Sequence, residues 1–267
     1  MTKFDDAIQA IRVDETTYDV CLDPGYAIGT ALNGGYLMAV LLRAVVDASP
    51  HEHPVSTSAQ FLRVPRPGPA VVRLEQVKTG RTTTVTRATM SQDDRAFLDA
   101  FVTTGTLSGE TAPGALEWSA TPAASMPPVA ECVALPAPKP ESNMTLNAQT
   151  ELLFDPPTIG WLSGTPTGRA ESRAYFRMTE PQDPDPYVLA LAVDALPPVV
   201  FSAGAKGWAP TVELTWYLRA LPAPGRLILL GSGTLVHDGW FDENVEVWDS
   251  TGRLVAQSRQ LARLGRP

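Results

Sequence analysis

The stretch Pro54-Val-Ser-Thr-Ser-Ala-Gln-Phe61-Leu62-Arg63 returns 156 residues later as Pro210-Thr-Val-Glu-Leu-Thr-Trp-Tyr217-Leu218-Arg219. Each copy runs into a turn rich in proline and glycine, and strand-like segments follow each turn. A repeat distance this long indicates one small domain that was duplicated and fused, rather than a solenoid of short repeats. Duplicated halves can diverge, so the positions at which they differ are the candidates for function.

Around the first copy, the sequence predicts a strand, a buried helix and a meander. Thr17–Leu22 is strand-like, and 36–47 is apolar on nearly every side, which is typical of a buried helix. Asn33 precedes this helix and is a suitable N-cap. Turn residues then separate four expected strands at 54–64, 69–79, 81–91 and 95–107.

Around the second copy the plan repeats. We expect a strand over 168–177 and an apolar helix over 187–193. Pro197 and Pro198 favour a fresh helix that starts at Asp194, because proline is tolerated in a first turn. Four more strands are expected at 210–220, 226–238, 242–249 and 253–264.

Each half therefore combines an antiparallel sheet with one apolar helix, which makes the fold class α+β. A sheet with a single apolar helix must wrap around it to bury it, and two such units can join their sheets. We expect an N-terminal unit at 1–107, a Pro/Ala-rich connector at 108–150 and a C-terminal unit at 151–267.

Composition narrows the class of partner. The chain of 267 residues has a net charge of −8, which argues against nucleic acid. Its two cysteines, Cys21 and Cys132, lack metal-type spacing and favour a reducing cytoplasm. We expect no signal peptide, no membrane-spanning segment, no metal and no cofactor.

At this point the chain resembles the hotdog fold, and the fused pair resembles the double-hotdog acyl-CoA thioesterases, the thioesterase II family. In the first half the resemblance is carried by Gly34-Gly35-Tyr36, Phe61-Leu-Arg63 with Pro65, and Gly80-Arg-Thr-Thr with Arg87. In the second half it is carried by Val193-Asp194, Thr211-Val-Glu-Leu-Thr and Gly252-Arg-Leu-Val-Ala-Gln-Ser-Arg-Gln260.

The resemblance implies hydrolysis of acyl-CoA thioesters to free acid and CoA, in fatty acid metabolism of a bacterial type. That family uses an Asp, a Thr and a Gln to hold and activate a water, and these map onto Asp194, Thr211 and Gln260. It also implies a homodimer and no cofactor. The family often has Asp-His-Ser-Met-Trp-Phe-His where this chain has Glu213-Leu-Thr-Trp-Tyr-Leu-Arg219, a difference that bears on substrate preference.

These residue types suit the reaction. A carboxylate can take a proton from water, and Thr and Gln can orient that water. A helix N-terminus offers free N–H groups to a carbonyl oxygen. We therefore expect Gly34 and Gly35 to polarise the thioester carbonyl, with glycine permitting close approach.

The repeat provides an internal comparison. Val55 falls opposite Thr211, Val102 falls opposite Gln260, and Asp194 falls near Gly35 when the helix starts are matched. The first half lacks the three polar groups, which predicts one site per chain.

Simpler roles stay open at this point. Asp194 could be only a helix N-cap, Thr211 a plain strand residue, Gln260 a solvent-facing side chain and Gly34-Gly35 a turn. Arginines in the first half could bind CoA phosphates or line a solvated sheet face: Arg63, Arg66, Arg73, Arg81 and Arg87. The alternative functions are a non-catalytic acyl or lipid binder, and a hotdog hydratase or dehydratase, which would need a buried Asp/His pair.

Overall fold

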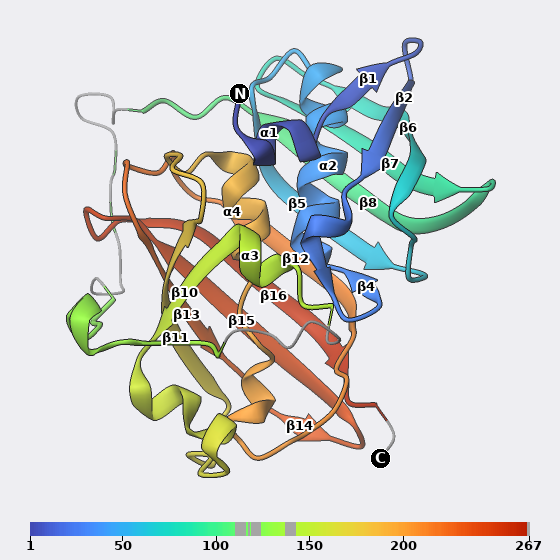
Figure 1. Ribbon diagram of the computed structural model, residues 1–267. Coiled ribbons are helices and arrows are strands. Elements are labelled where there is room, and N and C mark those ends of the chain that lie inside the picture. The colour runs from blue at the N-terminus through green and yellow to red at the C-terminus, as the bar shows by residue number, and fades with distance from the viewer. Residues whose placement is uncertain (110–115, 117, 119–123, 137–142, 266–267) are drawn as a thin grey trace.

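One continuous antiparallel sheet organises the protein. The computed structural model describes residues 1–109, 116, 118, 124–136 and 143–265. In this part of the chain, thirteen strands follow the order β1-β2-β6-β7-β8-β5-β12-β16-β15-β13-β11-β10-β9, with β14 paired to β15. The first half forms one end of the sheet and the second half forms the other (Figure 1).

The first half contains the expected strand, buried helix and four-stranded meander. Its elements are α1 (Lys3–Ala7), β1 (Ala10–Arg12), β2 (Thr17–Leu22), η1 (Pro24–Tyr26), β3 (Ala27–Ile28), β4 (Ala31–Leu32), α2 (Gly34–Asp47), β5 (His53–Phe61), β6 (Gly68–Thr79), β7 (Thr83–Gln92) and β8 (Arg95–Gly105). Asn33 is the N-cap of α2, since its side chain accepts a hydrogen bond from the Tyr36 N–H at 2.9 Å.

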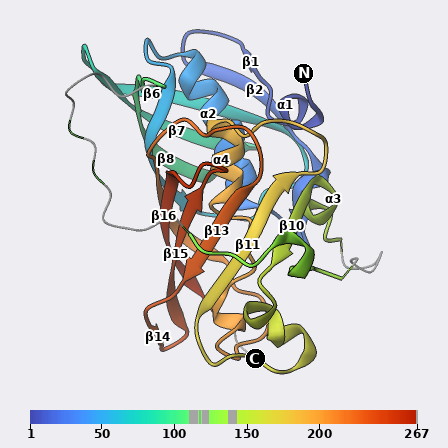
Figure 2. The ribbon, with the colours of Figure 1, turned by 90° about the vertical axis from the view of Figure 1, so that its left-hand side faces the viewer.

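The second half repeats this plan with additions at its outer edge. Its elements are η2 (Val129–Glu131), β9 (Val133–Ala134), α3 (Leu146–Gln149), β10 (Thr150–Phe154), η4 (Pro156–Ser163), β11 (Glu171–Met178), α4 (Pro186–Ala192), η5 (Val199–Phe201), β12 (Thr211–Leu218), β13 (Leu227–Ser232), β14 (Val236–His237), β15 (Trp240–Trp248) and β16 (Leu254–Arg263). Figure 2 shows β16, β15, β13, β11 and β10 side by side.

The predicted connector contains more structure than its composition suggests. Within 108–150, the described residues form η2, the edge strand β9 and α3, and β9 pairs with β10. The rest of the connector, at 110–115, 117, 119–123 and 137–142, lies outside the described residues.

The two duplicated strands lie next to each other and join the halves. β5 and β12 pair antiparallel, from Gln60 opposite Glu213 to Ser56 opposite Tyr217. This pairing removes two free sheet edges, as expected for two fused units.

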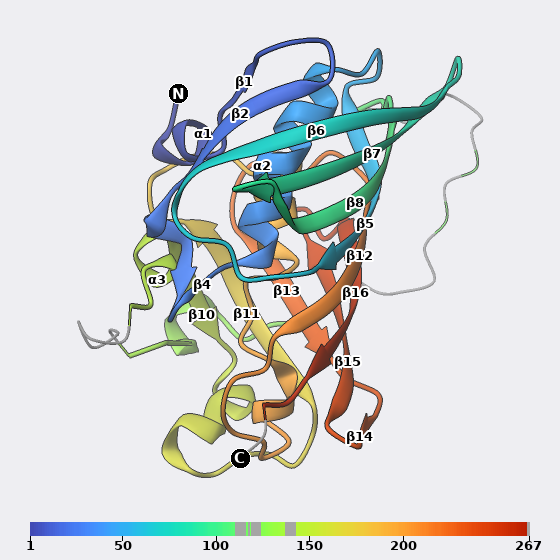
Figure 3. The ribbon, with the colours of Figure 1, turned by 90° about the vertical axis from the view of Figure 1, so that its right-hand side faces the viewer.

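The two central helices pack against each other on the concave side of the sheet. Figure 3 shows β6, β7 and β8 passing around α2. A Cβ atom added to Gly35, in the first turn of α2, would lie 2.6 Å from the carbonyl oxygen of Ala190 in α4. Glycine is therefore required here because the backbones of the two helices come too close for a side chain.

The prediction of a fresh helix at Asp194 is wrong. Asp194 follows the end of α4, and its N–H donates to the Leu191 carbonyl oxygen at 3.2 Å. The helix begins instead at Pro186, where the Asp185 side chain accepts hydrogen bonds from the next amides. After Asp194 only the 3₁₀ turn η5 forms.

The sequence repeat does not preserve side-chain direction. Phe61 points to the concave side, where its ring would meet a Cβ on Gly34, whereas Tyr217 is 44% exposed on the other face. A shift of one residue in a strand reverses every side chain. We therefore compare the halves by matching Ser58 with Thr215, which oppose each other across the central pair of strands.

Candidate active site

Asp194 lies where the two helices meet, between the end of α4 and the beginning of α2. Its Oδ2 atom accepts hydrogen bonds from the Gly35 N–H at 2.9 Å and from Asn33 Nδ2 at 3.0 Å. The Gly34 amide also favours the ionised form of this carboxylate and lowers its pKa. Asp194 is therefore no N-cap of its own helix, but it stabilises the N-terminus of a helix in the other half.

Burial raises the pKa of Asp194 to about 6, while the hydrogen bonds from Gly35, Gly34 and Asn33 oppose that shift. Part of its surface remains accessible. A carboxylate with this pKa is mostly ionised at neutral pH yet still basic enough to accept a proton from water.

Both glycine amides that were predicted to polarise a carbonyl act on Asp194 instead: the Gly35 N–H donates to it, and the Gly34 amide lowers its pKa. A carbonyl oxygen would have to share one of these N–H groups with the carboxylate. Their role in polarising a substrate stays a prediction.

Thr211 and Gln260 are in direct contact. The Thr211 hydroxyl donates to Gln260 Oε1 at 2.7 Å. Gln260 is 7% exposed, so it does not face solvent. Its strand, β16, turns Ser258 and Gln260 inward, and the Ser258 hydroxyl donates to the Val193 carbonyl oxygen just before Asp194.

A β-bulge aims Thr211 at this side of the sheet. The pairing of β12 with β16 shifts between Thr211 and Glu213, so these residues do not share a face as regular alternation would require. Glu213 instead bonds to Thr215 and lines a pocket on the outer face. Bulges often redirect side chains next to functional sites.

Glu243 is a site residue that the sequence analysis missed. It lies on β15 directly opposite Gln260 and is 2% exposed. The Gln260 side chain acts on the carboxyl group and lowers its pKa, against the larger and opposite effect of burial. The Oε2 atom of Glu243 accepts the Val199 N–H at 2.9 Å. Its place in an alternating strand gave no signal, because the register that pairs it with Gln260 appears only in the fold.

Glu243 also links Gln260 to Asp194. The pKa of Glu243 is raised to about 8, mainly by burial and also by the negative charge of Asp194. We refer to Asp194, Glu243, Gln260 and Thr211 as the polar cluster, in which Asp194 acts on Glu243 through its charge and Thr211 bonds to Gln260.

The first half holds no equivalent cluster among its described residues. Matching Phe101 with Arg259, which pair with Ser58 and Thr215, places Val102 at the position of Gln260. Thr86 then occupies the position of Glu243. Matching the helix ends rather than their starts places Ser49 at the position of Asp194, which corrects the earlier match to Gly35.

Two of the histidines have partners elsewhere in the fold. His51 is buried, and its Nε2 atom lies 3.1 Å from the Gly80 carbonyl oxygen. His53 Nδ1 accepts the Leu107 N–H. The described residues include no group of three or more His, Cys, Asp or Glu placed to hold a metal.

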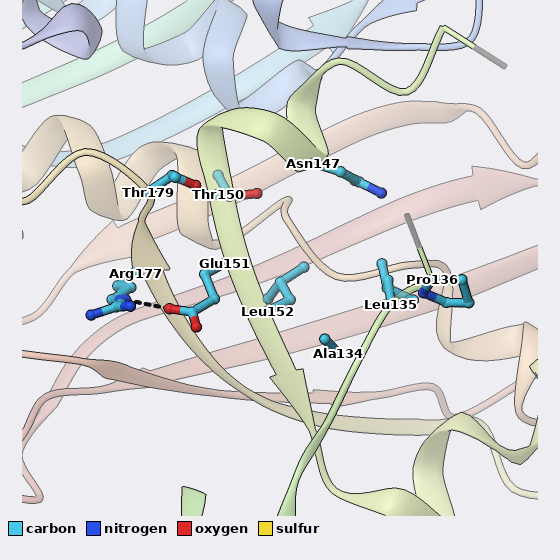
Figure 4. A pocket seen from close by; sticks show the side chains of 9 residues that line it. All are labelled: Ala134, Leu135, Pro136, Asn147, Thr150, Glu151, Leu152, Arg177 and Thr179. Carbon is cyan, nitrogen blue, oxygen red and sulfur yellow. Dashed lines mark hydrogen bonds and ion pairs between the residues drawn. The ribbon is translucent and has the colours of Figure 1, made fainter. Parts of the chain in front are cut away.

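A pocket at the outer edge of the second half is separate from this cluster. Figure 4 shows its lining, which consists of Ala134, Leu135, Pro136, Asn147, Thr150, Glu151, Leu152, Arg177 and Thr179. Glu151 pairs there with Arg177, and also with Arg226 at 3.0 Å. None of the lining residues belongs to the polar cluster.

Family comparison identifies the class of protein. Residues 22–108 match the acyl-CoA thioesterase N-terminal domain, and residues 129–264 match the acyl-CoA thioesterase C-terminal domain. The chain therefore belongs to the acyl-CoA thioesterase family.

The chain is also similar to individual proteins. The chain is 33% identical over 260 residues to the uncharacterized protein Rv0499 of Mycobacterium tuberculosis, covering 90% of this chain and 88% of that protein. It is 28% identical to the thioesterase-like protein TwmA of Talaromyces wortmannii, covering 98% of this chain and 91% of TwmA.

Solved structures confirm the predicted double hotdog. A candidate thioesterase II from Thermobifida fusca superposes with a TM-score of 0.90 at 44% identity, covering 100% of this chain and 98% of that one. A hotdog-fold protein from Alicyclobacillus acidocaldarius gives 0.85 at 23% identity, covering 100% and 99%. The acyl-CoA thioesterase II TesB2 of Mycobacterium marinum gives a TM-score of 0.74 at 17% identity, covering 99% of this chain and 98% of that one. At such low identity, the last two similarities bear on the fold alone.

No helix in the described part of the chain has the length and apolar composition that a membrane span requires.

Proposed function

We propose that the protein hydrolyses acyl-CoA thioesters with a water activated by Asp194 and oriented by Thr211 and Gln260. The observation that carries this proposal is the hydrogen bond between Thr211 and Gln260. It lies in the polar cluster, where the charge of Asp194 also raises the pKa of Glu243. Membership of the acyl-CoA thioesterase family supports the reaction class.

The proposed orientation of the water follows from the hydrogen bonds that each side-chain oxygen can still accept. Because the Thr211 hydroxyl donates to Gln260, its oxygen lone pairs remain able to accept a hydrogen bond from water. One water hydrogen then points to Thr211 and the other to Asp194, which leaves a water lone pair free to attack the carbonyl carbon. Such positioning can lower a barrier by several kcal/mol, out of roughly 7–11 kcal/mol for ideal geometry.

The electrons and protons balance without a cofactor. Water oxygen bonds to the thioester carbon as Asp194 takes the proton, and the carbonyl oxygen becomes an oxyanion. That oxyanion lies near the N-terminus of α2, where the helix dipole and the Gly34 and Gly35 amides favour negative charge. Its collapse breaks the C–S bond, and the CoA thiolate takes the proton from Asp194.

A thiol-release assay tests the proposal. Acyl-CoAs of several chain lengths are offered to the wild-type protein and to Asp194→Ala. Turnover by the wild type that disappears in the variant is the expected result. Binding of acyl-CoA without any release of thiol would instead favour the non-catalytic acyl binder.

The hydratase alternative has less support. It requires an Asp/His pair, and the two buried or half-buried histidines of the first half bond to Gly80 and Leu107. Incubation with an enoyl-CoA provides the check, since hydration would remove its absorbance without releasing thiol.

A further inference from the structure

Glu243 is a buried acid that the hydrolytic scheme above does not use. It lies on β15 opposite Gln260 on β16, and both side chains turn to the concave side of the sheet. Its surroundings include a small apolar cluster of Val200, Phe241 and Ala262. Burying a carboxyl group in such a place costs free energy, so an apolar residue would stabilise the fold more simply.

The contacts of Glu243 indicate what it does for Gln260. A glutamine amide has an acceptor oxygen on one side and a donor nitrogen on the other. Thr211 donates to the oxygen, which leaves the nitrogen to meet the Glu243 carboxyl group directly opposite on β15. A carboxyl oxygen at this place therefore favours one of the two orientations of the Gln260 amide.

Glu243 is itself held in place. The Val199 N–H donates to its Oε2 atom from the 3₁₀ turn η5, which follows Asp194 in the chain. The carboxyl group is thus fixed by the segment that also carries the proposed general base. It can hold Gln260 without relying on a mobile partner.

We propose that Glu243 is a positioning residue that fixes the side-chain amide of Gln260 with its oxygen toward Thr211. This inference rests on the proposed hydrolase function. In the hydrolytic scheme, the Thr211 oxygen accepts from the attacking water only while its own hydrogen is engaged by Gln260. Reversal of the amide would present nitrogen to Thr211 and withdraw that acceptor from the water.

Comparison with the first half supports a functional role for Glu243 beside Gln260. The same register position pairs Thr86 with Val102, and both are buried. The duplicated scaffold therefore folds without an acid at this place. The acid is found in the half that also carries Gln260, Thr211 and Asp194.

The test compares Glu243→Leu with Glu243→Gln by steady-state kinetics on acyl-CoA. In Glu243→Leu the Gln260 nitrogen has no acceptor, so we expect kcat to fall about 10- to 100-fold, a range typical of misplaced reacting groups, with KM little changed. Glu243→Gln keeps an acceptor oxygen and the same length, so it is expected to recover most of the lost kcat. A purely structural role would not produce this split between kcat and KM.

Asp155→Asn is the matched control. Asp155 is also a buried acid of the second half, and it pairs with Arg173 at 2.9 Å outside the polar cluster. Thermal unfolding of both variants shows how much stability each has lost. A kcat near that of the wild type in Asp155→Asn, at a similar loss of Tm, excludes general destabilisation as the cause.

Crystal structures of the wild type and Glu243→Leu provide a measurement that is independent of activity. We expect the contact between Thr211 Oγ1 and Gln260 Oε1 to be lost in the variant. Retention of that contact, or an unchanged kcat in Glu243→Leu, overturns the positioning role. A wild type that releases no thiol overturns the proposed function instead, and the crystallographic comparison still decides the role of Glu243.

Discussion

The Gly35 N–H donates a 2.9 Å hydrogen bond to Oδ2 of Asp194, although 159 residues separate them in sequence. This bond joins the first turn of α2 in one half to the end of α4 in the other. The proposed catalytic base is thus held by the N-terminal half while its chemical partners, Thr211 and Gln260, come from the C-terminal half. Both halves are required to build the site.

Gly35→Ala tests how tightly this junction is packed. The added Cβ would lie 2.6 Å from the Ala190 carbonyl oxygen and 2.9 Å from that of Leu191, so the two helices would have to separate. Overpacking of this kind costs about 1–3 kcal/mol of unfolding free energy. Chemical denaturation measures the change, and a loss of activity should accompany it because Asp194 moves with the junction.

Gly109→Ala is the control for Gly35→Ala. A Cβ on Gly109 would meet no atom within 4 Å, so the substitution should leave stability and turnover near wild-type values. Equal stability of the two variants would contradict the close approach of the helices.

The pH dependence of kcat/KM should follow ionisation of Asp194. The carboxyl group acts as a base only after it loses its proton, and burial raises its pKa to about 6. We therefore expect kcat/KM to rise with pH and to reach half its limit near pH 6. If the base were an exposed aspartate, kcat/KM would reach half of its limiting value near the ordinary aspartate pKa of 3.8.

Asp194→Asn completes that experiment. It keeps the size of the side chain and an acceptor for the Gly35 N–H, but removes the base. A loss of about 10²–10⁴-fold in kcat is the usual contribution of general base catalysis. A variant that keeps the wild-type rate and pH profile would assign the base to another group.

The sequence predicted most of the fold because the strands and helices are encoded locally. Apolar runs and turn residues placed α2 and the meander strands within a few residues of their bounds. The repeat led to the double hotdog, which the solved structures confirm. The strand β10 was missed because it follows the Pro/Ala-rich stretch, and its pairing with β11 and β9 forms only in the folded sheet.

The site was harder to predict because its geometry depends on register. Asp194 was placed at a helix start, since Pro197 and Pro198 suggested one, but the buried helix ends before it. Regular strand alternation would place Thr211 and Glu213 on one face, but the bulge in β12 separates them. Bulges and cross-strand pairs are decided by contacts between segments far apart in the chain, which local patterns do not encode.

Thr211→Val and Glu213→Gln test the consequence of that bulge. Thr211 bonds to Gln260 on the concave side, so its loss should lower kcat, by about tenfold or more if it orients water. Glu213 lies on the outer face beside Thr215 and Tyr217, so Glu213→Gln should leave kcat unchanged. Similar kinetic losses in both variants would contradict their placement on opposite faces.

Glu243 should make the protein less stable as pH rises. Its pKa is raised from an ordinary value of 4.5 to about 8, so the folded state binds its proton more tightly than the unfolded chain does. The stabilising contribution is complete below pH 4.5 and is lost as pH rises through 8. Between these values the free energy of unfolding should fall by up to about 1.4 kcal/mol per pH unit.

Glu243→Gln isolates this effect, because the variant has no proton to lose at that position. Asp194 also has a raised pKa, so it too stabilises the folded protein while it is protonated. This stabilisation is lost earlier than that of Glu243, as the pH rises through about 6. Denaturation curves of wild type and Glu243→Gln from pH 5 to pH 9 therefore have to be compared with each other rather than read singly. The wild type should lose stability relative to the variant most steeply between pH 5 and pH 8. If the two curves run parallel over this range, Glu243 is already ionised in the folded protein, and the buried acid does not hold its proton.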